Sequence, residues 1–145
     1  MAHIYVLALQ NEVHERWTHA AACSLLDHWL TRQPDLAFGA QCDNNLIGAF
    51  VVGIRPWWDG NHLVDGELFV HPQFQNQGVA RALMRCTLQT AIEKYNPVLW
   101  ESYTFKDQQF PLDWYKRIGF SEIDEWVMIR AQVSTVAAKL GCAND

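Results

Sequence analysis

The hydrophobic period of this chain changes at Gly78, and this change limits the possible folds more than any other feature. Residues 63–70 are mostly apolar and end at His71 and Pro72, which predicts a strand. From residue 78 to residue 94, polar side chains recur every four positions and apolar ones fill the other faces, which predicts an amphipathic helix. The polar stretch between them is therefore a strand-to-helix connection.

The rest of the chain predicts further strands before this unit and a strand, helix, strand order after it. Asp43, Asn44 and Asn45 tolerate a left-handed backbone and lie between two apolar segments, so they predict a hairpin turn. We expect strands at residues 3–9, 36–41, 46–54, 63–70, 98–103 and 126–130, helices at 13–30, 78–94 and 112–117, and a loop at 56–62. This order predicts a mixed α/β fold.

Length and composition limit the classes of protein. A chain of 145 residues without a linker is the size of one domain, so we expect one domain over residues 1–131 and a tail over residues 132–145 with a possible short helix. A net charge of -5 argues against a broad nucleic-acid surface. No apolar run is long enough to cross a bilayer and no signal sequence precedes the domain, so we expect a cytoplasmic protein with no membrane partner. The four cysteines form no CxxC pair, so no metal site is expected.

The start of the predicted helix at Gly78 is a candidate anion site. The first N–H groups of a helix lack intrahelical acceptors and carry partial positive charge, and a glycine lets an anion approach them. Arg81, one turn into the helix, can add a cation. An ordinary strand-to-helix connection explains the same residues, and Gly78 alone leaves both interpretations open.

Two motifs in this order resemble the GNAT superfamily of acyl-CoA-dependent N-acetyltransferases. The first is Val-x-Pro-x-x-Gln-x-x-Gly-Val-Ala at residues 70–80, and the second is Trp-Tyr-x-x-x-Gly-Phe at residues 114–120. The resemblance implies a GNAT-like single domain with a twisted, mostly antiparallel sheet, and acetyl-CoA as the acyl donor. It also implies that Tyr115 donates a proton to the departing thiolate, although an aromatic residue that packs a short helix would look the same.

The resemblance implies a set of residues that bind the acyl donor. The pantetheine arm would lie along the strand at Leu68, Phe69 and Val70, like an added strand. The pyrophosphate would bind main-chain N–H groups of the loop and helix start, at Gln75, Gln77, Gly78, Val79, Ala80 and Arg81. The chain departs from the commonest family pattern at three positions, since Gln75, Ala80 and Gln108 stand where arginine, glycine and asparagine are frequent.

Acetyl transfer to an amine needs a proton acceptor, because a lysine-like amine is mostly protonated at neutral pH. Asp65 and Glu67 lie two residues apart on the strand that ends at Val70, so alternation places them on one face. An acidic residue at the position of Glu67 is common in family members that act on amines. Glu101 on the next strand is a weaker candidate, and solvated carboxylates on a sheet edge remain the alternative.

The loop before this strand is a candidate acceptor site. Trp57 and Trp58 stand beside Asp59, and aromatic faces with a carboxylate attract ammonium groups. Such a site suits a polyamine, an amino sugar or a lysine side chain. The same tryptophans equally suit a cap on the core or a contact in a homodimer.

These observations predict an enzyme that moves an acetyl group from acetyl-CoA to a primary amine by direct attack, without a metal. The acceptor would be a small cationic amine, an amino sugar, or a lysine or N-terminal amine of a peptide. Two alternatives from other classes are a non-catalytic acyl-CoA-binding module and a protein-interaction module that docks through the tryptophans.

Overall fold

A four-stranded sheet in the order β1-β2-β3-β4 organises the first part of the chain in the computed structural model, which describes residues 1–11, 14–107 and 109–142. The strands are β1 (Ala37–Cys42), β2 (Asn45–Trp57), β3 (Gly60–Val70) and β4 (Leu99–Glu101). The first three pair antiparallel, and β4 pairs parallel to β3. The predicted mixed α/β fold with a mostly antiparallel sheet is confirmed.

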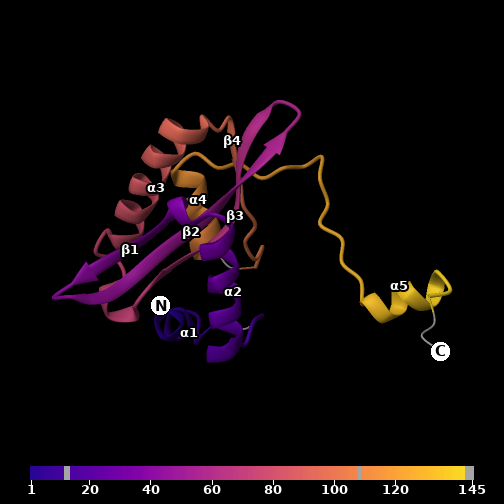
Figure 1. Cartoon of the computed structure of the whole chain (residues 1–145), viewed down its shortest axis with the longest axis horizontal. Coiled ribbons are helices and arrows are strands. Elements are labelled where there is room, and N and C mark those ends of the chain that lie inside the picture. The colour runs from indigo at the N-terminus through magenta and orange to yellow at the C-terminus, as the bar shows by residue number, and fades with distance from the viewer. Residues whose placement is uncertain (12–13, 108, 143–145) are drawn as a thin grey trace. The chain divides into compact units, whose positions relative to one another are not determined.

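Helices cover both faces of this sheet (Figure 1). On one face, α1 (Ala2–Ala8) and α2 (His19–Arg32) pack against Ala49, Val51 and Phe69 to form the buried core. On the other face lies α3 (Val79–Tyr95), whose buried side chains include Leu83, Met84 and Ala91. Because both faces are covered, β2 is buried continuously from Ile47 to Gly53 rather than alternating.

The chain divides into two units, Met1–Tyr103 and Thr104–Asp145. The first holds the sheet with α1, α2, α3 and the short 3-10 turns η1 (Pro34–Leu36) and η2 (Pro72–Phe74). The second holds α4 (Gln109–Arg117) and α5 (Val133–Lys139). No helix in the described residues has the length and apolar character needed to span a membrane.

Several elements agree with the sequence. The hairpin between β1 and β2 is confirmed, with Asp43 and Asn44 at φ of 48° and 63°, the left-handed values that its two-residue turn requires. Helix α3 and the strand before it are also confirmed, and α4 contains the predicted short helix.

Other elements differ for physical reasons. Residues 3–8 of the predicted strand belong to helix α1, because a short continuous apolar run has no period and packing on α2 and β3 decides its form. Residues 56–62 are the end of a hairpin rather than a loop, with Trp57 paired to Gly60. Residues 126–130 form no strand, and Val127 and Ile129 are 81% and 86% exposed. Helix α2 begins at His19, where the Thr18 hydroxyl accepts a hydrogen bond from the N–H of Ala21.

A β-bulge at Gly66 interrupts the pairing of β2 with β3. Val51 pairs with Glu67 and Gly53 pairs with Val64, so β3 has one more residue than β2 across this interval. Gly66 has φ of 105°, and a Cβ at this position would overlap the carbonyl oxygen of Val51. A side chain at residue 66 is therefore opposed by both backbone conformation and space.

We expect Gly66→Ala to lower the free energy of unfolding by about 2 kcal/mol or more, because strain and overlap act together. Gly78→Ala is a matched control, since Gly78 also has positive φ but a Cβ there meets nothing within 4 Å. Denaturant unfolding of both variants measures the difference. Equal losses would contradict the proposed overlap at the bulge.

Asp35 ties η1 to the C-terminal end of α3. Its carboxylate accepts hydrogen bonds from the Tyr95 hydroxyl at 2.6 Å and from the Lys94 ammonium at 3.1 Å. The Tyr95 hydrogen bond is the main cause that lowers the pKa of Asp35 from 3.8 to about 2. A carboxylate with a lowered pKa stabilises the fold above its unfolded pKa, and that contribution is lost as pH falls through the folded pKa.

We therefore expect Tyr95→Phe to lower the melting temperature at neutral pH, with a difference from wild type that shrinks as pH falls from about 4 to about 2. Thermal unfolding across this range measures the difference. A difference that stays constant down to pH 2 would contradict the role of Asp35.

Candidate functional site

The bulge leaves one edge of β3 without a partner strand in the described part of the first unit. Strand β4 pairs only with His62, Leu63 and Val64, which precede the bulge. Beyond it, Glu67 to Val70 pair with β2 on one side only. In the described part of the first unit, no strand therefore lies beside β3 beyond the bulge on the side where β4 pairs before it.

The register shows which backbone groups face this open edge. In antiparallel pairs, alternate residues direct both N–H and C=O at the partner strand. The N–H of His71 donates to the Ile47 carbonyl at 2.8 Å, so Phe69 and Glu67, two and four residues earlier, also direct their backbone groups at β2. Leu68 and Val70 therefore direct their backbone groups at the open edge, as the Gln75 side chain confirms by donating to the Val70 carbonyl at 3.1 Å.

Beyond this edge, α3 begins with an open N-terminus. Gly78 caps the helix in the left-handed conformation at φ of 84° and offers no side-chain cap to the first turn. Ala82 makes the first helical hydrogen bond, to the Gly78 carbonyl, so the N–H groups of Val79, Ala80 and Arg81 come before it. Gly78 and Arg81 are exposed and the first turn holds no acidic residue. This geometry suits an anion.

The loop side chains hold the loop in shape. The amide of Gln75 is bonded to Val70, and the amide of Gln77 donates to the Gln73 carbonyl at 2.9 Å. Asn76, between them, has φ of 60°. Both predicted glutamines therefore lie in the strand-to-helix connection with their donors directed at its backbone, which leaves anion contacts to the main chain.

Glu67 lies on the sheet face that α1 covers. The hydroxyl of Tyr5 on α1 donates to Glu67 Oε2 at 2.9 Å, and Tyr5 is 2% exposed. Burial, followed by the charge of Glu67, raises the pKa of Tyr5 far above its ordinary value, so Tyr5 remains a donor. The bulge breaks the alternation that predicted a shared face for Asp65 and Glu67, because the register puts Val64 on the face of Glu67. The side chain of Asp65 lies outside the described residues.

The hairpin end of β2 and β3 gathers a separate charged cluster. His62, 2% exposed, has Nε2 at 2.8 Å from Asp59 Oδ1 and Nδ1 at 3.3 Å from Glu101 Oε2. Glu101 also pairs with Arg55, whose guanidinium lies 4.8 Å from the centre of the Trp57 ring. The predicted carboxylates Asp59 and Glu101 are thus together, with the His62 ring between them and the Arg55 guanidinium paired to Glu101.

The tryptophans of this hairpin differ in exposure. Trp57 is 45% exposed and carries Arg55 over one face, whereas Trp58 is 87% exposed at the turn. A cation already occupies the aromatic face that was predicted to attract a substrate ammonium.

Tyr115 lies in α4, in the second unit. Its ring packs against Trp114 and Phe120 with centroid distances of 5.3 Å and 5.2 Å. Its carbonyl accepts from the N–H of Phe120, just after the chain leaves α4 at Gly119. The second predicted motif is thus one local structure. Gln108 lies outside the described residues.

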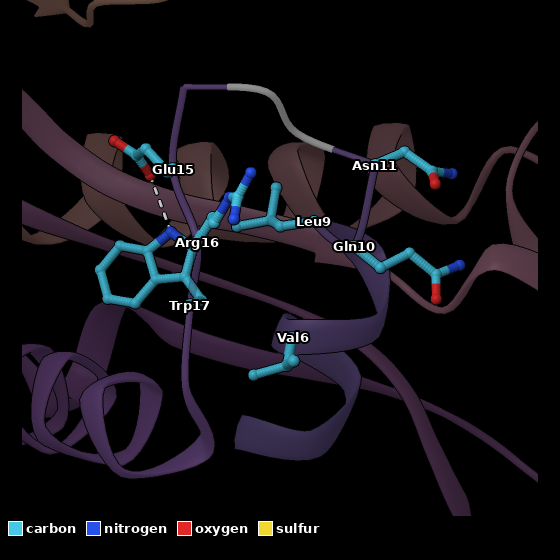
Figure 2. Close-up of a pocket in the computed structure, with 7 residues that line it drawn as sticks. All are labelled: Val6, Leu9, Gln10, Asn11, Glu15, Arg16 and Trp17. Atoms are coloured by element: carbon cyan, nitrogen blue, oxygen red, sulfur yellow. Dashed lines mark hydrogen bonds between the residues drawn. The ribbon is translucent and has the colours of Figure 1, made fainter.

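A pocket of about 480 Å³ lies beside α1, on the chain that leads to α2. Its lining residues are Val6, Leu9, Gln10, Asn11, Glu15, Arg16 and Trp17. Figure 2 shows the carboxylate of Glu15 above the Trp17 ring, whose Nε1 donates to it at 2.7 Å, and the carboxamides of Gln10 and Asn11 on the opposite side. The pocket combines an aromatic face with charges of both signs.

The comparison with protein families decides the family. The family model of GNAT acetyltransferases matches residues 2–120. The chain belongs to the GNAT acetyltransferase family. No curated protein matches the sequence.

Solved structures similar to this GNAT protein share its fold at low sequence identity. An integron cassette protein from the mobile metagenome of V. cholerae has a TM-score of 0.73 and 18% identity, over 98% of this chain and 90% of that one. The aminoglycoside N-acetyltransferase AAC(6')-Iy in complex with CoA has a TM-score of 0.65 and 22% identity, over 90% and 87%. A ribosomal-protein-alanine N-acetyltransferase from Brucella melitensis has a TM-score of 0.62 and 19% identity, over 90% and 92%.

Sequence reasoning missed three residues that shape this GNAT site. Gly66 had a usable signal, because a glycine inside a strand pattern often marks a bulge. His62 was assigned to the predicted loop at residues 56–62 and was not considered as a site residue. Tyr5 had no signal, since its contact with Glu67 joins residues 62 positions apart.

Proposed function

We propose that this GNAT protein transfers an acetyl group from acetyl-CoA to a primary amine. The single observation that carries the proposal is the juxtaposition of two backbone features along one short stretch of chain, an edge with no partner strand in the described part of the first unit and a helix start without a side-chain cap. The open edge of β3 at Leu68 and Val70 is followed, eight residues after Val70, by the uncapped N-terminus of α3 at Gly78. An extended arm and a diphosphate need these two features in this order.

The residues fit the acyl donor in the following way. The pyrophosphate would bind the N–H groups of Val79, Ala80 and Arg81, where the helix dipole favours negative charge. The Arg81 side chain would add a cation. The pantetheine arm would lie against the backbone of Leu68 and Val70 and add a strand to the open edge. Bound there, acetyl-CoA supplies a thioester carbonyl as the electrophile.

The reaction needs a base, an oxyanion donor and an acid. Glu67 would accept the proton of the acceptor ammonium, which releases the amine lone pair for attack. The outward N–H of Val70 would donate to the developing oxyanion. As the carbon–sulfur bond breaks, Tyr115 would protonate the thiolate. The attacking nitrogen then loses its second proton, which restores the Tyr115 hydroxyl, so the products are an amide, a free thiol and one proton on Glu67.

The acceptor amine is proposed to bind near Glu67 rather than at the tryptophan hairpin. At about 3.3 Å per residue, Glu67 lies roughly 20 Å along β3 from the hairpin end at Gly60, too far for one small amine to contact both. The cluster there already pairs its carboxylates with Arg55 and His62. A cationic amine agrees with the net charge of -5. Structural neighbours named for an aminoglycoside and for a ribosomal protein alanine support both small-molecule and peptide amines as candidates.

A panel of amines tests the proposal directly. We expect acyl-CoA to co-purify with the protein by mass spectrometry, and thiol release from acetyl-CoA to rise with particular primary amines. Tight binding of acetyl-CoA without release for every amine would instead support a non-catalytic binding module.

For Tyr115→Phe we expect turnover to fall by roughly tenfold or more, because the leaving thiolate loses its proton donor, with little change in acetyl-CoA affinity. Steady-state thiol release and calorimetry measure the two quantities. Tyr95→Phe is the control, because the Tyr95 hydroxyl bonds to Asp35 and has no role in the proposed reaction. Unchanged turnover would remove Tyr115 from this role.

For Gly78→Glu we expect acetyl-CoA affinity to fall by about tenfold or more, because a carboxylate at the start of α3 repels the diphosphate. Gly78→Gln is a matched control with the same size and no charge. Calorimetry at low salt measures both variants. Equal affinities for the two would argue against an anion site at this helix start.

A further inference from the structure

We propose that Tyr5 is a positioning residue for Glu67, whose carboxylate it holds in place at the open edge of the sheet. The inference rests on the proposed function, in which Glu67 is the base. Tyr5 itself touches no reacting atom in this account. Its role is to fix where the proton acceptor stands.

The contact is direct and well defined. The Tyr5 hydroxyl donates to Glu67 Oε2 at 2.9 Å, between α1 and a residue of β3 that follows the bulge. A hydrogen bond to a carboxylate is charge-assisted and stronger than one between neutral groups. It also restricts rotation of a side chain that otherwise has three free torsions. The Glu67 side chain on β3 is thereby held by a residue of α1, the helix that packs on this face of the sheet.

Tyr5 is itself held on two sides. Its ring makes an edge contact with Phe69 at 5.1 Å and another with Trp17 at 5.2 Å, both with interplanar angles of 86°. At 2% exposure the ring is enclosed by its neighbours, which limits its movement. Phe69 is on β3, two residues after Glu67, so the same strand carries both the base and the ring that orients its donor.

The donor stays protonated. Burial and the charges of Glu67 and Glu15 all raise the pKa of Tyr5. The phenol therefore acts as a fixed hydrogen-bond donor and does not take the amine proton itself, which leaves Glu67 as the acceptor.

Tyr5 also joins Glu67 to the pocket beside α1. Trp17 lines that pocket and touches the Tyr5 ring, and Val6 and Leu9 of the lining follow Tyr5 along the chain. Glu15 of the pocket contributes to the raised pKa of Tyr5, which puts its charge within range of the phenol.

A purely structural role must be separated from positioning, because loss of a buried hydroxyl lowers stability in either case. Tyr95→Phe is a matched control, since Tyr95 also donates its hydroxyl to a carboxylate, Asp35, in the same unit. Both variants remove one oxygen from one tyrosine–carboxylate pair. Of these two tyrosines, Tyr5 is the one that bonds to Glu67.

The experiment measures kcat and acceptor KM for wild type, Tyr5→Phe, Tyr95→Phe, Glu67→Gln and the Tyr5→Phe/Glu67→Gln double variant. We expect Tyr5→Phe to lower kcat by roughly tenfold while the acceptor KM stays within about twofold, because the base is displaced and binding is not. We expect Tyr95→Phe to leave kcat within about twofold of wild type. In the Glu67→Gln background, Tyr5→Phe should lower kcat no further.

Thermal unfolding of the same variants gives a readout that does not depend on activity. We expect Tyr5→Phe and Glu67→Gln each to lower the melting temperature, with the double variant close to the single ones, as coupled partners require. An active wild type whose kcat is unchanged by Tyr5→Phe, or lowered equally by Tyr95→Phe, overturns the inference and leaves the proposed function standing. A wild type that binds acetyl-CoA and releases no thiol with any amine overturns both, and thermal coupling then identifies the pair as structural only.

Discussion

The extra residue in β3 at Gly66 is the constraint on which the candidate site depends. A sheet strand normally has both edges paired or one edge at the border of the sheet along its whole length. In β3 both conditions occur on one edge. Before the bulge this edge pairs with β4, and after the bulge none of the described strands of the first unit pairs with it. The bulge requires positive φ and a position without a Cβ, and glycine meets both needs. The open edge of β3 begins at this bulge.

The two ends of β3 therefore serve different purposes. The end near the hairpin is closed by β4 and by the buried His62, which lies between Asp59 and Glu101. Its charges are paired within the protein, and Arg55 supplies the cation for both Glu101 and the Trp57 ring. The end beyond the bulge presents backbone groups at its open edge and carries Glu67. A rigid, internally paired end and an open, polar end are what a site on a sheet edge requires, because the paired end fixes the geometry of the other.

Two tyrosine–carboxylate pairs show how one interaction serves two different positions. Tyr95 and Asp35 tie η1 to the end of α3 and contribute stability that depends on pH. Tyr5 and Glu67 tie α1 to the strand beside the open edge. In both pairs the hydroxyl donates to a carboxylate, but only the second lies on the strand that carries the open edge. Its location, rather than the type of bond, is the basis for proposing a positioning role for Tyr5.

Local sequence determined the elements whose signals are local. The period of residues 78–94 and the left-handed turn at Asp43 and Asn44 could each be read from neighbouring residues. The two motifs at residues 70–80 and 114–120 together indicated the GNAT family, and Gly78 marked the start of the candidate anion site. The tertiary structure decided what depends on contacts between distant residues. Residues 3–8 form part of a helix because packing, not period, decides the form of a short apolar run. The neutralisation of Glu101 by Arg55, and the hydrogen bond from Tyr5 to Glu67, join residues 46 and 62 positions apart, and no local pattern encodes such distances.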